Sequence, residues 1–147
     1  MENKINQNKD TLDELNKGCS MGMDAIKYTL DKVEDDSFKK VLENQYKEYD
    51  IIHEQIEKIY SNYSDENPTE TNAMNKAMTW SSVEMKTLMD NSNSKIAELL
   101  LQGTNMGIIE GRKLLNHKSE LDKDVEKILH DYVNMQENAV EILKEYL

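Results

Sequence analysis

Apolar residues recur at alternating steps of three and four along most of this chain, which is the spacing that lines one face of an amphipathic helix. Only one proline, Pro68, interrupts the chain, whereas short strands joined by tight turns would need many more turn residues. We therefore expect an all-α fold in a single domain spanning residues 1–147. The expected helices cover about residues 11–34, 36–63, 72–90, 95–116 and 120–146.

The gaps between the expected helices predict how they pack. The first two helices are almost contiguous, and so are the last two, so each pair should form a tight antiparallel hairpin. Between the hairpins lie a polar loop at residues 64–71 and the additional helix 72–90. Such a connection is typical of a four-helix bundle with a long crossover. If the crossover runs the length of the bundle, the fourth expected helix lies antiparallel to the first.

All five glycines fall inside two of the expected helices, in two ladders with four-residue steps. One ladder is Gly18 and Gly22, and the other is Gly103, Gly107 and Gly111. Each glycine in a helix interior costs roughly 1 kcal/mol relative to alanine, so we expect a compensating gain from close packing. Glycines four apart share one face and let a neighbouring helix approach closely. We expect the two ladders to face each other at mid-bundle, with a ligand against bare backbone as the alternative.

The charge of the chain argues against two classes of partner. Its net charge is −11, and Arg112 is its single arginine. Because phosphate-binding surfaces need clustered cations, we expect neither nucleic acid nor an anionic membrane as a partner. The chain has no long apolar run and no signal-peptide pattern at its start, and its lone Cys19 suits a reducing compartment, so we expect a cytoplasmic protein.

Two local sequences in the first hairpin carry a family resemblance. They are GCSMGMDA at residues 18–25 and EDDSFKKVL at residues 34–42. Together with the helix layout, they resemble the ferritin-like superfamily, especially small bacterial ferritin-like domains of unknown function, over about residues 12–146. The resemblance implies a ferritin-like bundle. It also implies that family members acting as oxidases or iron stores bind two metals between the helices.

A dimetal site of that kind needs an inward carboxylate on two helices and a Glu-x-x-His pair on the other two. This chain has no Glu-x-x-His, and its nearest approach is Asp50 with His53. His53 lies at the edge of an apolar stripe, and Asp50 lies outside it. Glu110 shares a predicted stripe with Gly103 and Gly107, so it is the one carboxylate expected to face the core. We expect it to bond polar side chains on other core stripes rather than a metal. Those side chains are Gln45, Tyr49, Tyr132 and Gln136.

Methionines gather on one side of the helix expected at residues 72–90. Met74, Met78, Met85 and Met89 share that side, with Trp80 beside them. Methionine is flexible and polarizable, so this side could cover the bundle, form a dimer contact or build an adaptable binding surface. Thioethers at i and i+4 could also hold Cu(I), which we regard as the lesser alternative. A tryptophan beside such a surface is typical of an interface anchor.

Two hypotheses of function follow from these observations. The first is a structural or interaction protein, a ferritin-like bundle with an incomplete dimetal site, no cofactor and no enzymatic activity, which forms a homo-oligomer, most simply a dimer. The alternative is a metal-binding ferritin-like protein that uses iron for oxidase or iron-handling activity, with Glu110, Asp50 and His53 among its ligands. The sequence points to no particular protein partner.

Overall fold

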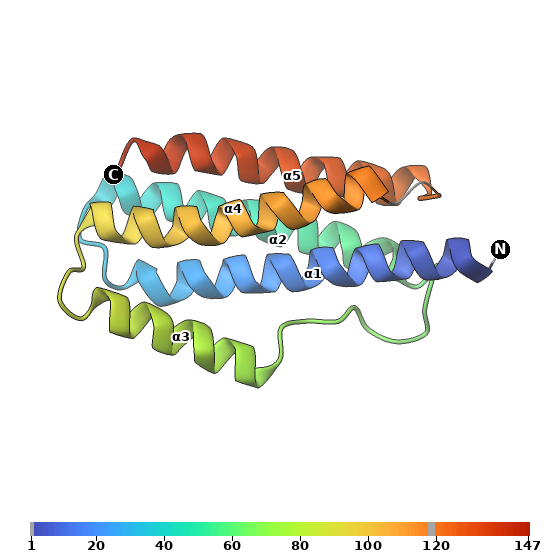
Figure 1. Ribbon diagram of the computed structural model, residues 1–147, viewed down its shortest axis with the longest axis horizontal. Helices are drawn as coiled ribbons and strands as arrows, with labels where there is room; N and C mark the ends of the chain where they lie inside the picture. The colour runs from blue at the N-terminus through green and yellow to red at the C-terminus, as the bar shows by residue number, and fades with distance from the viewer. Residues whose placement is uncertain (1, 118–119) are drawn as a thin grey trace.

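The computed structural model describes residues 2–117 and 120–147, and these residues form an all-helical structure with no strand (Figure 1). The expected all-α fold is therefore confirmed. The helices are α1 (Glu2–Leu30), α2 (Asp36–Tyr60), α3 (Ala73–Thr87), α4 (Asn93–His117) and α5 (Lys123–Lys144). The break expected between the last two helices falls partly outside the described residues.

Four of the helices are long and lie side by side (Figure 1). α1 and α2 form one antiparallel hairpin, and α4 and α5 form the other. α1 also packs against α4, and α2 packs against α5, so the two hairpins enclose a common core. The connection from α2 returns along the molecule before α4 begins, and α4 therefore runs antiparallel to α1, as expected (Figure 1). α3 lies in this connection, outside α1.

α1 differs most from its expected bounds. It begins at Glu2 rather than near residue 11, and it ends at Leu30 rather than near residue 34. Its early turns bury Asn8 and Thr11, and the Asn8 side chain accepts a hydrogen bond of 2.9 Å from the Asp122 amide. Because these buried residues are polar, the apolar pattern could not reveal the turns. The other four helices begin and end within three residues of their expected bounds.

Side-chain caps fix where three helices begin. Asp35 accepts a 2.8 Å hydrogen bond from the Phe38 amide at the start of α2, and Asn72 caps α3 in the same way through the Asn75 amide, also at 2.8 Å. The Ser92 hydroxyl accepts from the Lys95 amide at 3.2 Å as α4 begins. These caps satisfy amide donors that have no partner within the helix. The extended backbone of Asp35 also explains why α1 cannot continue into α2.

The core runs through the middle of the two hairpins. Cys19 is fully buried there, as expected for a small core residue, and burial raises the pKa of its thiol well above its ordinary value. One end of the core is closed by Phe38, whose ring stacks on Tyr146 with centroids 4.4 Å apart. The largest fully buried side chains include Leu12, Leu15, Phe38, Leu42, Ile56, Ile96, Leu129 and Leu143.

Four of the five glycines lie where a side chain would collide with a neighbour. A Cβ at Gly22 would come within 2.8 Å of three ring atoms of Tyr49, and one at Gly111 would come within 2.6 Å of a Val133 methyl group. Gly18 similarly abuts the Tyr132 hydroxyl, and Gly107 abuts the Gln136 amide. Close packing at these four positions is confirmed.

Two details of the glycine expectation are wrong. Gly103 is exposed, and no atom that its Cβ would meet lies within 4 Å, so it is not a packing position. The ladders are also not in direct contact, although α1 and α4 do pack together, because the atoms nearest to Gly18, Gly22, Gly107 and Gly111 are side-chain atoms of α2 and α5. The glycines of α1 and α4 instead make room for large side chains of α2 and α5. Their small size serves side-chain insertion into the core rather than contact between helix backbones.

None of the helices within residues 2–117 and 120–147 is both long enough and apolar enough to cross a membrane.

Candidate interaction surface

α3 packs against the bundle through a small face, and its methionine side chains point toward solvent. Only Val83 and Thr87 of this helix are buried, and their four-residue spacing places them on one side. Helical spacing places Met74, Met78 and Met85 on the opposite side. The helix therefore packs on α1 through the smaller of its two apolar faces.

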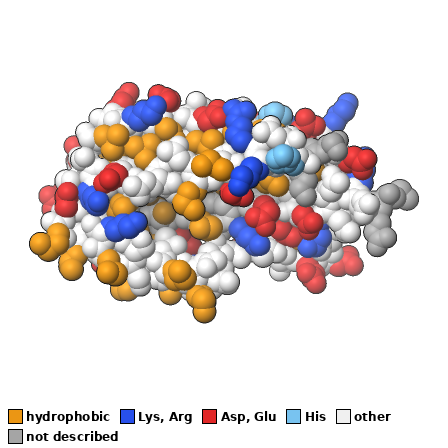
Figure 2. Space-filling view, in the orientation of Figure 1, with side chains coloured by type: hydrophobic (Ala, Val, Ile, Leu, Met, Phe, Trp, Pro, Cys, Tyr) orange, Lys and Arg blue, Asp and Glu red, His pale blue; other side chains and the backbone are white. Residues whose placement is uncertain are grey.

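We call the outward side of this helix, together with the two residues that follow it, the methionine face; it comprises Met74, Met78, Met85, Leu88 and Met89. Their exposed fractions lie between 63% and 93%. Figure 2 shows hydrophobic side chains gathered along the lower left edge of the molecule, over α3. The expectation that these residues share one side is confirmed, whereas the alternative that they cover the bundle is wrong.

Trp80 lies to one side of the methionine face. It is 52% exposed and therefore packs only partly against its own chain. Its helical position is closer to Val83 and Thr87 than to the methionines. Whether it anchors an interface stays a prediction.

Two ion pairs hold α3 in this orientation. Lys76 Nζ lies 2.8 Å from Asp24 Oδ2 of α1, and Lys32 Nζ, in the turn after α1, lies 2.8 Å from Glu84 Oε1. The hydrogen bond to Asp24 raises the pKa of Lys76 and so favours its ammonium form. Because polar contacts fix the inner side of the helix, the methionine face stays directed away from the bundle.

The segment before α3 is also fastened to α1, at a site that we call the crossover clamp. Asp13 Oδ1 accepts hydrogen bonds from the Thr69 amide at 3.0 Å and the Tyr60 hydroxyl at 2.7 Å, while Lys9 Nζ bonds Asp13 Oδ2 at 2.9 Å. Asn16 Nδ2 donates to the Thr69 carbonyl at 3.1 Å. Both backbone groups of Thr69 are thus held by side chains of α1, and the extended crossover follows a fixed course.

The charges at the clamp shift two pKa values. Burial alone would raise the pKa of Asp13, but hydrogen bonds from the Thr69 amide, Lys9 and Tyr60 outweigh burial and lower it. The hydrogen bond to Asp13, together with its charge, raises the pKa of Lys9 to about 12. The folded clamp therefore favours an ionised carboxylate beside an ionised amine.

A small cavity of about 180 Å³ lies beside the clamp, under the crossover. His53 borders it, with Nδ1 2.6 Å from Asn16 Oδ1 and Nε2 3.2 Å from Glu57 Oε1. Asp24 and Lys76 on the opposite wall bond each other. The remaining lining residues are Ser20, Met23, Tyr46 and Glu70. Three of its polar lining residues, Asp24, His53 and Lys76, thus bond side chains of the protein itself.

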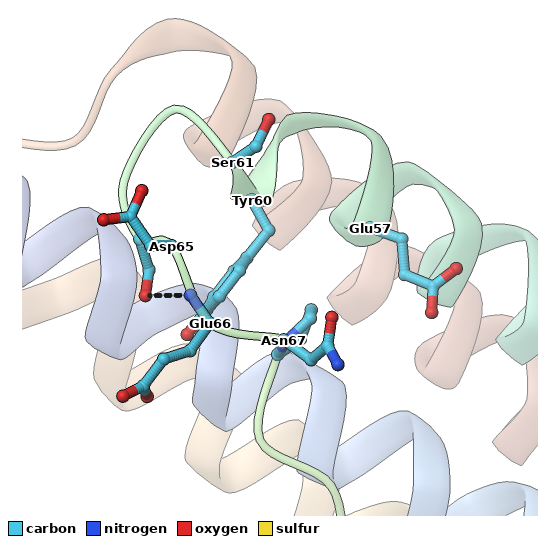
Figure 3. Close-up of a pocket in the computed structure, with 8 residues that line it drawn as sticks. Glu57, Tyr60, Ser61, Asp65, Glu66 and Asn67 are labelled. Carbon is cyan, nitrogen blue, oxygen red and sulfur yellow. Dashed lines mark hydrogen bonds between the residues drawn. The ribbon is translucent and has the colours of Figure 1, made fainter.

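A larger cavity, about 520 Å³, opens between the end of α2 and the loop that follows it. Glu57, Asp65 and Glu66 are acidic residues in its lining, and Figure 3 shows their carboxylates pointing away from one another. The one hydrogen bond drawn there joins the Glu66 amide to the Ser64 hydroxyl and stabilises the loop itself. These carboxylates do not converge on a common ligand.

The middle of the core holds a cluster of neutral polar side chains. Gln136 Nε2 donates to the hydroxyl groups of Tyr49 and Tyr132, both at 3.3 Å. Burial raises the pKa of both tyrosines, so the phenols stay protonated at physiological pH. Gln45 is also buried, and its Nε2 and the Gln136 Oε1 have no hydrogen-bond partner within the described residues. The sequence therefore identified the four residues of this cluster, Gln45, Tyr49, Tyr132 and Gln136, as core residues.

The metal-ligand candidates do not come together. Glu110 is exposed, with 69% of its side chain accessible, and lies 3.5 Å from Lys113 on its own helix. The expectation that it faces the core is wrong, because α4 buries Leu100, Thr104 and Gly111 instead. His53 lies at the clamp with Asn16 and Glu57, and Asp50 borders neither cavity described above.

The donors in the bundle core do not fit a dimetal centre. Such a centre needs four carboxylates and two imidazoles, while the core offers amides and protonated phenols. Within the part of the chain that the structure describes, no three His, Cys, Asp or Glu side chains gather in a way that could hold a metal ion.

Comparison with protein-family models, with curated proteins and with solved structures finds no match to this chain. The ferritin-like resemblance therefore stays a prediction based on layout and local sequence.

Proposed function

We propose that this chain is a structural or interaction protein, a ferritin-like bundle with an incomplete dimetal site that forms a homodimer through the methionine face. One observation carries the proposal: five large apolar side chains, three on α3 and two on the residues directly after it, project into solvent although polar contacts join the helix to the bundle. Contiguous exposed apolar side chains on a soluble domain typically mark an interaction site. Because the chain carries a charge of −11, neither nucleic acid nor an anionic membrane is part of the proposal, and we place the protein in the cytoplasm.

The methionine face is large enough to support association. Fully burying one methionine or leucine side chain contributes about 1.5–3 kcal/mol. The five side chains on each of two copies, most of whose surface is exposed, therefore offer on the order of 10–20 kcal/mol. Association costs about 4–15 kcal/mol in lost translational and rotational freedom. The gain and the cost are of similar size, so the methionine face supports a dimer that forms reversibly.

The test combines size-exclusion chromatography with light scattering on three proteins. We expect the wild type to be a dimer and the double variant Met78→Glu/Met85→Glu to be a monomer, because two charges on each copy would be buried at the contact. The double variant should melt like the wild type in dilute solution, since both side chains are exposed in the single chain.

Ile51→Glu is the matched control. Ile51 is also an exposed apolar residue, but it lies on α2 and not on the methionine face. The control should remain a dimer. If the methionine double variant remains a dimer, the methionine face is not the dimer contact. The same conclusion follows if the control loses the dimer to the same extent.

A further inference from the structure

The methionine face contains a helical seam whose order of side-chain sizes is symmetric about its centre. Met74, Met78, Ser81, Met85 and Leu88 follow one another at steps of four, three, four and three, and all five are exposed. This is the spacing of the seam between two coiled helices. Its order is large, large, small, large, large, with Ser81 at the centre. We call this set the α3 seam.

Such a pattern suits a contact between two copies that are related by a two-fold axis. In an isologous contact, residue i of one copy meets residue j of the other, and j meets i. If two copies of α3 lie antiparallel with Ser81 on the axis, Met74 lies level with Leu88 of the second copy, and Met78 lies within one residue of the level of Met85. The small serine at the crossing point lets the two helices approach closely, and the large side chains fill the space on either side.

We infer that the methionine face binds a second copy of this chain in an antiparallel α3-to-α3 contact with Ser81 on the two-fold axis. This inference rests on the proposed self-association and adds its geometry, including which residues of the two copies meet.

The charges on α3 do not oppose this contact. The chain carries −11 overall, so two copies repel each other, whereas α3 carries only Lys76, Glu84 and Lys86 and is therefore positive by one charge. Lys76 and Glu84 are directed to their ion-pair partners, Asp24 and Lys32, rather than to the seam. No charged residue belongs to the seam.

The available area suits a small, reversible interface. A fully buried methionine or leucine removes on the order of 60–120 Å² of apolar surface from water, so the methionine face offers on the order of 250–500 Å² on each copy. Two copies bring on the order of 500–1,000 Å² to the contact, which is the size of weak, transient interfaces below about 1,200 Å².

Disulfide cross-linking tests the position of the axis. We expect Ser81→Cys to give a covalent dimer on mild oxidation, because the new thiol of one chain faces the same thiol of the second chain across the axis. Cys19 does not compete, because it is fully buried. Asn75→Cys is the matched control: Asn75 is exposed on the same helix but lies off the seam and far from the axis, so it should not cross-link.

A second pair of variants tests the direction of the helices. When Met74→Cys and Leu88→Cys proteins are mixed in reductant and then oxidised, an antiparallel contact yields the mixed disulfide, which mass spectrometry distinguishes from either homodimer. A parallel contact instead links Met74→Cys to itself, and that result would overturn the inference.

The outcomes separate the geometry from the proposed function. A wild-type dimer in which neither Ser81→Cys nor the mixed pair cross-links would reject the antiparallel contact and leave self-association standing. A wild-type monomer by light scattering would reject both. Cross-linking of Ser81→Cys and of the mixed pair, with Asn75→Cys unlinked, supports the inference.

Discussion

At the scale of single residues, the glycines are the clearest case of a local cost offset by packing. Gly22 and Gly111 each lie against a side chain that would collide with a Cβ, whereas Gly103 faces open space. The same residue type in the same kind of helix therefore has opposite consequences at different positions. Helix propensity sets the cost of each glycine, but its neighbours decide whether the cost is offset.

This contrast gives a matched pair of variants. Gly103→Ala should stabilise the protein by up to about 1 kcal/mol, because the helix gains propensity at no steric cost. Gly22→Ala should destabilise it by about 1–2 kcal/mol net, because the buried Tyr49 ring, held by Gln136, cannot move aside cheaply. Urea unfolding measures both free energies. Equal effects of the two substitutions would contradict the packing account.

The placement of Glu110 shows where residue-level prediction failed. The stretch from residue 101 to 111 contains three glycines and a threonine, so its apolar signal is weak and either of two adjacent faces fits it. The structure buries Thr104 and Gly111, which rotates Glu110 to the surface. A core position held by threonine or glycine leaves no hydrophobic mark in the sequence. The strongly patterned helices gave no such ambiguity, and Gln45, Tyr49, Tyr132 and Gln136 were all predicted as core residues and are buried.

At the scale of the elements, α3 and its approach segment are attached mainly by polar contacts. The apolar pattern predicted that the methionines share a side, but it could not say whether that side faces the bundle. Val83 and Thr87 gave no strong signal, yet they are the buried residues of the helix. The decisive contacts, Lys76 with Asp24 and the crossover clamp at Asp13, join residues far apart in the chain. Such pairings are outside the reach of a single-sequence pattern.

The crossover clamp predicts a pH dependence of stability. The pKa of Asp13 is lower in the folded chain than its ordinary value of 3.8, so the folded state favours the ionised form. Its contribution is present above that ordinary value and is lost as the pH falls toward the lowered, folded value. Asp13→Asn should therefore destabilise the protein at neutral pH by about 1.5–3 kcal/mol, the usual range for hydrogen bonds to a charged group.

The measurement is the free energy of unfolding of wild type and Asp13→Asn between pH 7 and pH 2. The difference between the two curves should be constant at neutral pH and shrink below about pH 4 as Asp13 protonates. Other carboxylates titrate in both proteins, so the comparison isolates this one. A difference that stays constant down to the lowest pH would show that the charge of Asp13 is not what stabilises the clamp.

At the scale of the whole molecule, two hairpins and a crossover that returns along the bundle were predictable from helix lengths and gap lengths. Within the described residues, the polar cluster at the middle of the core contains no carboxylate. It consists of Gln45, Tyr49, Tyr132 and Gln136, and Gln136 donates hydrogen bonds to both tyrosine hydroxyls. The bundle is thus organised around neutral hydrogen bonds rather than around charge.

The composition of the core predicts the result of an iron-loading experiment. Protein expressed with added iron and then desalted should retain well under one iron per chain by elemental analysis, because carboxylate and imidazole ligands do not meet in the core. Glu110→Ala should leave the iron content unchanged, since Glu110 is exposed beside Lys113. Stoichiometric iron that is lost in Glu110→Ala would favour the metal-binding alternative.

The central claim is that two copies associate through the methionine face, and the molar mass in solution tests it most directly. Light scattering across a dilution series should give twice the 17.1 kDa of the chain at high concentration, with dissociation on dilution. Met78→Glu/Met85→Glu should give the single-chain mass throughout. A wild-type mass that stays at 17.1 kDa at every concentration would contradict the account.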